Sequence, residues 1–517
     1  MKRLALLAAL VGLGCHVTVT SATPGDGQTA APKVPTVDAK RIRTTLTAFA
    51  DDAMRGRYTV RAEDIGKAAD FLVAEYQRAG VAPVGPDYRA TYTFPVPGST
   101  RVSSDVNVWL EVDRQPHEVE AADVVSIANG NGTPIIGPVV VIPPDGEHAK
   151  KAADKVALVF GARTEPAKIG ALVAKLRDAG AKGAVLVASD GASMPDAASL
   201  AAAVGEPSMP AVLLRAHAVL GLSMEGKPLS ALAGSDDAVD APTLVVSLAA
   251  RLEDVTAQAP NVLAHIPGTD LADEIVVVGA HFDHIGTSTE GYFCSARTLD
   301  DGTNDEICNG ADDNGSGTVG VLEIARALAE SGVAPRRTIV FAHFSGEELG
   351  LFGSKALADH PPDAPPFAKG RVVAMVNMDM IGRYGAAGLS IGAISSSDAW
   401  MPILEQAGDH DLEITYERAV TARSDHANYY RKQVPVLFFF TGLHADYHGP
   451  GDEIDQINFD AMTEIVQLAL DVTLAAADGR DMSFAPPRSD KEGITNRMPG
   501  SDPQTVEKKV EAAGPQL

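Results

Sequence analysis

The second half of the chain alternates between two hydrophobic patterns. Short runs of almost uninterrupted apolar residues predict buried strands, because a strand covered on both faces has no polar side. Four such runs lie at 274–280, 337–344, 371–378 and 435–442. Segments with apolar residues at helical spacing accompany them, most clearly at 318–332 and 459–478. This alternation predicts an α/β fold whose sheet is covered by helices on both faces.

The first half of the chain has a different texture. Two helices are predicted at 39–49 and 64–80, where apolar residues again recur at helical spacing. From about 122 to 250, short β-branched strands surround one helix and a looser segment rich in Ala, Gly and Pro. We expect 122–250 to form a small inserted domain, which divides the main domain into 37–121 and 251–478.

The ends of the chain are predicted to be processed or unstructured. Residues 1–22 are typical of an export signal, because a basic start precedes an apolar run too short to anchor in a membrane. Residues 23–36 have the composition of a linker, and 479–517 are polar with scattered Pro, which favours a disordered tail.

The cleavage site of the signal has two interpretations. The sequence before Cys15 resembles a bacterial lipoprotein signal, whereas cleavage after Ala22 would release a soluble protein. We therefore expect an exported protein that is secreted, periplasmic or anchored by lipid at Cys15 to a bacterial cell envelope. The other two cysteines, Cys294 and Cys308, flank one loop, and an oxidising compartment permits a disulfide between them. Two free thiols are the alternative.

Charge and hydropathy exclude two classes of partner. The chain carries a formal net charge of −25, and both nucleic acid and anionic membranes require a basic surface. No stretch after the N-terminal signal is long and apolar enough to be a membrane-spanning helix. With 517 residues, two or three domains are expected.

Polar side chains follow each of the four predicted strands. In strand order they are His281, then Glu347 and Glu348, then Asp379, then Tyr447 and His448. The turn-forming segment GADDNGSGT at 310–318 adds Asp312 and Asp313 just before a predicted helix. Each of these alone has an ordinary structural explanation, as a surface histidine, a helix start or an N-cap. Open α/β sheets bind ligands beyond the carboxyl ends of their strands, so together they indicate one site.

The residue types at these positions indicate a metal. Two His, two Asp and one Glu form a nitrogen and oxygen ligand set without thiolates, which suits zinc, with Co²⁺ or Mn²⁺ as substitutes. Five ligands are too many for one catalytic zinc with an open position. They fit two ions about 3.5–4 Å apart that share one carboxylate. We therefore expect two Zn²⁺ per chain.

Six segments in order resemble the zinc aminopeptidases of the M28 family. They are GAHFDH, NGADDNGSGT, FSGEELGLFGS, VNMDMIG, SDHANY and DYHGPGD. The resemblance covers most of 261–478 and implies a three-layer αβα zinc-peptidase fold with a mostly parallel mixed sheet. The segment 122–250, through KVALVFG and LRDAGAKGAVLV, resembles a small β-rich protease-associated domain.

The resemblance implies the metal-binding role of each candidate ligand. Asp313 would bridge the two ions, and the peptide bond after it would be cis. His281 and Asp379 would complete one zinc site, and Glu348 and His448 the other.

Three further residues acquire roles by the same resemblance. Glu347 would be the general base, Tyr447 would help to stabilise the oxyanion, and Asp283 would orient the imidazole of His281. The nearby His426 and His444 stay unassigned between the site and its loops.

These roles imply an exported metallo-exopeptidase that removes N-terminal amino acids from peptide or protein substrates. A carboxypeptidase is an alternative, although no arginine-rich motif accompanies the site to bind a substrate carboxylate. A glutaminyl cyclase typically uses one zinc, and a catalytically inactive receptor-like protein would not need all five ligands and Glu347. Side-chain specificity, natural substrate, the role of the inserted domain and the oligomeric state do not follow from the sequence.

Overall fold

The computed structural model describes most of the chain after its N-terminal segment. The described residues are 33–102, 107–128, 134–204, 209–234, 237–249, 252–299, 301–489 and 492–497. The predicted signal, Cys15 and most of the predicted linker lie outside them.

The main sheet has nine strands within the described residues. Across the sheet the order is β1, β13, β17, β14, β18, β22, β19 and β20, with β2 also paired to β13. Their bounds are β1 (Ala82–Pro83), β2 (Arg89–Val102), β13 (Leu252–Ile266), β14 (Leu271–His281), β17 (Arg337–Phe344), β18 (Arg371–Met378), β19 (Leu389–Gly392), β20 (Ile414–Tyr416) and β22 (Val436–Phe440).

The four central strands run parallel and are the four apolar runs of the sequence. β14 pairs in parallel with β17 on one side and β18 on the other, and β18 pairs in parallel with β22. Alternate residues of β14 enter opposite cores, with Val276 and Val278 on one face and Val277 on the other. Both faces are therefore covered, which explains the lack of polar alternation in these strands.

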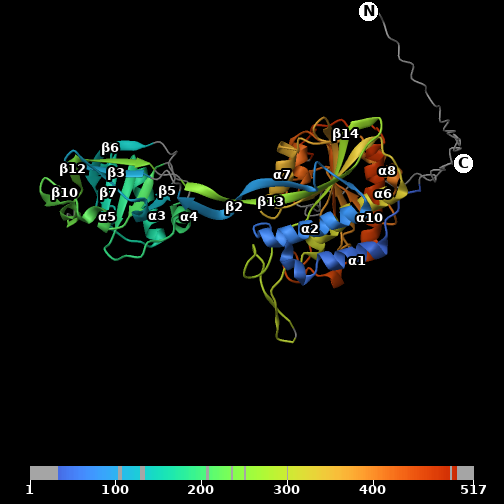
Figure 1. Cartoon of the computed structure of the whole chain (residues 1–517), viewed down its shortest axis with the longest axis horizontal. Coiled ribbons are helices and arrows are strands. Elements are labelled where there is room, and N and C mark those ends of the chain that lie inside the picture. The colour runs from blue at the N-terminus through green and yellow to red at the C-terminus, as the bar shows by residue number, and fades with distance from the viewer. Residues whose placement is uncertain are drawn as a thin grey trace, which may run out of the picture.

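Helices cover the two faces of this sheet (Figure 1). One face packs against α1 (Ala39–Phe49), α2 (Ala62–Ala79), α6 (Gly317–Ser331), α8 (Trp400–Ala407) and α10 (Phe459–Ala477). The opposite face packs against α7 (Phe352–Asp359) and α9 (His426–Arg431). The predicted mixed sheet between two layers of helices is confirmed.

A second sheet of eight strands stands beside the main one and is joined to it by the long β2 and β13 (Figure 1). Its order is β4 (Gln115–Glu118), β3 (Asn107–Val112), β12 (Val239–Ala249), β6 (Ile135–Val141), β7 (Val156–Ala162), β8 (Gly183–Ala188), β9 (Ala211–Leu214) and β5 (Val124–Ala128). The accompanying short elements are α3 (Pro166–Asp178), α4 (Ala197–Val204), α5 (His217–Leu220), β10 (Ser223–Met224) and β11 (Lys227–Pro228).

This second sheet begins earlier than the boundary predicted at 122. β3 pairs antiparallel with β12, and its Leu110 lies opposite Val246 in a core shared by both strands. The prediction assigned 107–118 to the main domain because these short segments carry no marker of the change. The protease-associated nature of the second unit stays a prediction.

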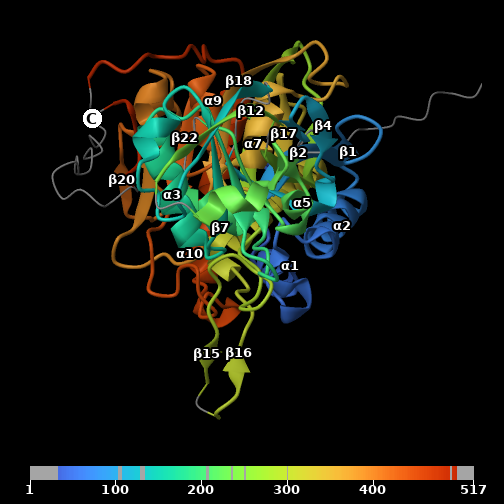
Figure 2. The same cartoon turned by 90° about the vertical axis from the view of Figure 1, so that its left-hand side faces the viewer.

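A hairpin projects from the main unit beside α1 (Figure 2). It contains β15 (Arg297–Thr298) and β16 (Asn304–Asp305), which pair antiparallel. A disulfide joins Cys294 to Cys308 at the base of this loop. No helix in the described part of the chain has the length and apolar character needed to cross a membrane.

The prediction of a disordered tail from 479 is wrong for 479–489 and 492–497. Met482 is buried in the main core, and the ring of Phe484 lies 5.3 Å from that of Tyr430. β23 (Ile494–Thr495) pairs in parallel with β21 (Val420–Thr421). The few apolar residues of a largely polar segment are enough to dock it, which a composition argument overlooks.

The buried His343 on β17 provides a pH test of the packing between α2 and the main sheet. Its Nε2 lies 2.7 Å from the hydroxyl of Tyr76 on α2, and burial lowers the pKa of His343 to about 3. The unfolded chain takes up this proton near pH 6.5, whereas the folded protein does not. Its contribution to stability is therefore complete above pH 6.5 and is lost as the pH falls towards 3.

We expect His343→Gln, which can still pair with Tyr76, to remove this contribution to the pH dependence. Between pH 6 and 4 the free energy of unfolding of the wild type should fall by up to about 1.4 kcal/mol per pH unit more than that of the variant. Denaturant unfolding in chelator at several pH values measures the difference. Parallel curves would show that His343 does not stay neutral in the fold.

Candidate metal centre

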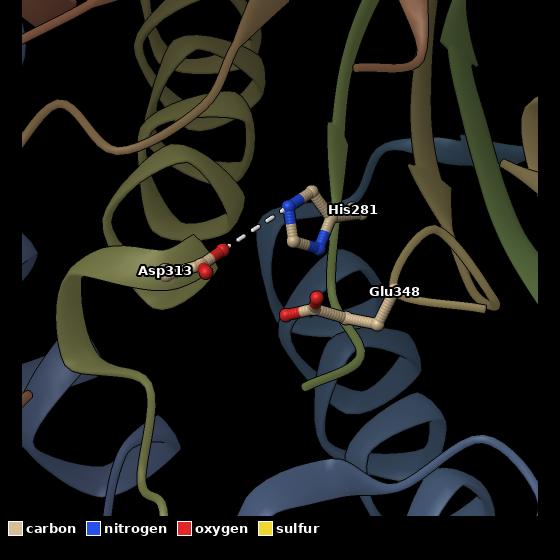
Figure 3. Close-up of side chains that lie close together, drawn as sticks. All are labelled: His281, Asp313 and Glu348. Atoms are coloured by element: carbon tan, nitrogen blue, oxygen red, sulfur yellow. Dashed lines mark ion pairs between the residues drawn. The ribbon is translucent and has the colours of Figure 1, made fainter. Parts of the chain in front are cut away.

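The centre lies beyond the carboxyl ends of the parallel strands. His281 is the last residue of β14, between β17 and β18, so the loops after those strands reach it from both sides. Its Nε2 lies 3.2 Å from Oδ1 of Asp379, which follows β18, and 4.0 Å from Oε2 of Glu347, which follows β17. The same nitrogen lies 3.4 Å from Oδ1 of Asp313 (Figure 3).

Asp313 stands between two groups of potential ligands. Its Oδ1 faces His281, whereas its Oδ2 lies 3.2 Å from Nε2 of His448. Oε2 of Glu348 lies 3.0 Å from the same nitrogen of His448. The two oxygens of one carboxylate therefore point to two different donor sets.

The donors fit metal ions. Two sets of three residues each bring their potential ligand atoms within 4.8 Å of one another. One set is His281, Asp313 and Glu348, and the other is His281, Glu347 and Asp379. Nε2 of His448 is buried and makes no hydrogen bond of good geometry, although two carboxylate oxygens are near it. A ring nitrogen held among carboxylates without a hydrogen bond suits a cation, and the nitrogen and oxygen donors suit zinc.

Burial sets the protonation of the site. It raises the pKa of Glu347 well above its ordinary value and also raises that of Asp379. Although burial opposes it, contacts with His281 and His448 hold the pKa of Asp313 well below its usual range. Burial also raises the pKa of Tyr447, so its hydroxyl keeps its proton. Glu347 is thus the carboxyl best suited to take up a proton, and Asp313 the one best suited to stay ionised.

The loop before α6 presents Asp313 and turns Asp312 away. The carboxylate of Asp452 accepts the backbone N–H groups of both, at 2.9 and 2.8 Å. The carboxylate of Asp312 does not face the centre as that of Asp313 does, because its Oδ1 accepts a hydrogen bond from the backbone N–H of Gly382. Gly310 has φ +58°, and a Cβ there would lie 2.2 Å from the carbonyl oxygen of Asp313. The peptide bond between Asp313 and Asn314 is cis.

Asp283 is fully buried beneath the centre. Its carboxylate accepts the hydroxyl of Thr59 at 2.8 Å and the backbone N–H of Glu347 at 3.2 Å. Nδ1 of His281 lies 3.3 Å from the backbone oxygen of Asp283 and 3.8 Å from its carboxylate. In this structure the carboxylate therefore fixes the loop of Glu347 more directly than it contacts the imidazole.

The structure adds Arg57 to the residues that build the centre. It is fully buried, and its guanidinium donates to the carbonyl oxygens of Phe282, Asn309 and Gly310 at 2.9, 2.6 and 2.9 Å. Burial lowers the pKa of Arg57 to about 10, so it stays charged at neutral pH. Its position in the segment DDAMRGRYT was the available signal, but nothing there shows which carbonyls it binds.

The remaining histidines divide between the centre and its surroundings. Nδ1 of His284 lies 2.7 Å from Oε1 of Glu348, a contact that the sequence analysis did not predict. The only signal for it is the second histidine of GAHFDH. His444 approaches Asp312, at 3.4 Å, and His426 stacks on Phe438 with 4.4 Å between ring centroids.

We expect Arg57→Met to destabilise the fold and the centre together. The variant leaves the buried carbonyl groups of Phe282 and Asn309 without the guanidinium donor, at a cost of at least about 2 kcal/mol. Denaturant unfolding and zinc content measure the two effects, with the exposed Arg163→Met as the control. Wild-type stability and zinc content in Arg57→Met would contradict this role.

Comparison with known proteins places the centre in a family. The family model described as Peptidase family M28 matches residues 261–473. A probable leucine aminopeptidase of Arthroderma otae is 32% identical over 222 residues, 41% of this chain and 56% of that protein. The leupeptin-inactivating enzyme 1 of Streptomyces exfoliatus is 29% identical over 36% of each chain.

The chain spans about half the length of the curated relatives it matches. Among solved structures, a zinc aminopeptidase from Bacillus subtilis aligns with 88% of this chain and 99% of its own, at 18% identity and a TM-score of 0.46. The segment matched by the family model contains the four central strands and every candidate ligand. The chain therefore carries a peptidase family M28 domain.

Proposed function

We propose that this protein is an exported zinc aminopeptidase with a dinuclear metal centre. The observation that carries the proposal is the position of Asp313, whose two carboxylate oxygens face separate donor sets at 3.4 and 3.2 Å. A carboxylate in that position can bridge two ions. The family assignment and the leucine aminopeptidases among its relatives support peptide hydrolysis.

The residues present would hold the two ions on either side of Asp313. His281 and Asp379 would complete one site, and Glu348 and His448 the other. Ser424 donates to Oδ2 of Asp379 at 2.7 Å, which keeps Oδ1 turned towards His281. When bound, a zinc pair supplies a Lewis acid for the carbonyl oxygen and activates water at neutral pH.

Glu347 and Tyr447 would move or hold protons in the reaction. The nearly buried carboxylate of Glu347, whose pKa burial raises, accepts a proton from water and delivers it to the leaving amine. The hydroxyl of Tyr447, which burial keeps protonated, donates to the developing oxyanion. Its ring stacks on that of His448, with 3.9 Å between the ring centroids, so Tyr447 lies beside a candidate ligand.

The charges around the site favour a substrate with a free amino group. Arg57 is engaged by three carbonyl oxygens, and Arg383 pairs with Asp446 at 2.9 Å. Arg57 is therefore not free to bind a substrate carboxylate, as a carboxypeptidase requires, and Asp446 already balances the charge of Arg383. The disulfide between Cys294 and Cys308 supports export, because such bonds persist in oxidising compartments.

The purified protein should contain about two zinc ions per chain and cleave aminoacyl p-nitroanilides with a free amine. Elemental analysis and the hydrolysis of matched free and N-acetylated substrates test both expectations on one sample. Equal cleavage of the acetylated substrates would reject an aminopeptidase. One zinc per chain would favour the glutaminyl cyclase alternative, and a protein with neither zinc nor activity would favour the receptor-like alternative.

Glu347→Gln should lower kcat by at least about 10³-fold while leaving two zinc ions bound, because it removes the proton acceptor and keeps the side-chain shape. Steady-state kinetics and zinc content measure the two quantities. The exposed Glu63→Gln on α2 is the matched control and should behave as the wild type. Full activity in Glu347→Gln would show that another group takes the proton.

A further inference from the structure

Glu348 uses its two oxygens for different partners. Oε2 lies 3.0 Å from Nε2 of His448, on the side of the second donor set. Oε1 lies 2.7 Å from Nδ1 of His284, which is fully buried. His284 thus occupies the oxygen of Glu348 that does not face His448.

His284 is itself held from two directions. Its backbone N–H donates to the carbonyl oxygen of Arg57 at 3.3 Å, and it forms an isolated parallel bridge with Tyr58. Its ring lies against Gly310, where a Cβ would come within 2.6 Å of the imidazole. The ring is therefore clamped between the N-terminal segment and the loop that presents Asp313, and its Nδ1 has little freedom to leave Glu348.

We propose that His284 is a positioning residue that holds Glu348 as a one-oxygen ligand of the ion shared with His448. The inference rests on the dinuclear centre of the proposed function and deepens it. Nδ1 carries the proton and donates a hydrogen bond to Oε1. This bond fixes the plane of the carboxylate and leaves Oε2 for the metal. Nδ1 has no second acceptor at the centre, because it lies 3.9 Å from Oδ2 of Asp313, beyond a hydrogen bond.

Loss of this donor has a defined consequence. Without it, the carboxylate of Glu348 can rotate about its terminal bond and offer either oxygen, so the ion loses a pre-oriented ligand. The other ion keeps His281 and Asp379. Within the described residues, neither is a hydrogen-bond or ion-pair partner of His284. The effect should therefore fall on one ion of the two.

Three substitutions separate the hydrogen bond from the imidazole itself. His284→Ala removes the donor. His284→Asn places an amide N–H close to the position of Nδ1, whereas His284→Gln carries its amide further along the side chain. The exposed His360→Ala at the end of α7 is the control for the loss of a histidine elsewhere.

The test measures metal binding in the absence of substrate. Metal-free protein is titrated with Zn²⁺ against a chromophoric chelator, and with Co²⁺ while its visible absorption is recorded. We expect His284→Ala to bind one ion about 10–100-fold more weakly and the other as the wild type does. His284→Asn should restore most of the lost affinity and His284→Gln should not, and the Co²⁺ spectrum of the weakened site should change in Ala and Gln only.

Two outcomes overturn the proposal: wild-type affinity for both ions in His284→Ala, or equal affinities of the Asn and Gln variants. The second comparison holds even if His284→Ala does not fold, and unfolding in chelator tests whether the Asn and Gln variants are equally stable. The metal titration uses no substrate, so it tests His284 whether or not the protein is a peptidase. If the wild type bound two zinc ions but had no peptidase activity, the proposed aminopeptidase would be rejected and the test of His284 would still stand.

Discussion

The structure depends on the burial of like charges at one edge of a sheet. Five carboxylates gather beyond the ends of β14, β17 and β18 with little exposure to water: Asp283, Asp313, Glu347, Glu348 and Asp379. Carboxylates removed from water repel one another and lose their hydration, so they require cations or donors. Three imidazoles, one buried guanidinium and a set of backbone N–H groups meet part of this requirement, and metal ions would meet the rest.

The parallel strands supply the site with its geometry, and the N-terminal segment supplies its rigidity. Adjacent parallel strands end at the same edge, which explains why His281 and Asp379, 98 positions apart in sequence, come within 3.2 Å. The segment around Arg57 and Thr59 packs beneath the candidate metal centre. Arg57 donates to carbonyl oxygens in the loop after β14, at Phe282, and in the segment before α6, at Gly310. Thr59 links Asp283 to the loop that carries Glu347. These contacts hold Asp313 in the irregular π-helical turn Ala311–Ser316, which leads into α6.

Sequence patterns predicted the parts of this arrangement that repeat locally. The strands at 337–344 and 371–378 and the helix at 39–49 have the predicted bounds, because burial imposes a periodicity that a short window can detect. The candidate ligands follow strand ends, so their convergence could also be predicted. The contacts of Arg57 and His284 could not be predicted, since the carbonyl partners of Arg57 lie 225 to 253 residues away, Glu348 lies 64 residues from His284, and no local pattern marks those contacts. The ordered part of the tail was missed for the same reason, as Phe484 is explained only by Tyr430.

The chain leaves the main unit for the second sheet and returns to it along neighbouring strands. Val102 of β2 and Leu252 of β13 are register partners, although 149 residues separate them in sequence. The ends of the insertion are thus already side by side, so its length adds only a slowly growing closure entropy to the main unit. In topological terms the second sheet replaces the turn of a long β-hairpin. A tight turn of a few residues joining β2 to β13 would preserve every strand connection of the main sheet, so one internal deletion in the gene would separate the two units.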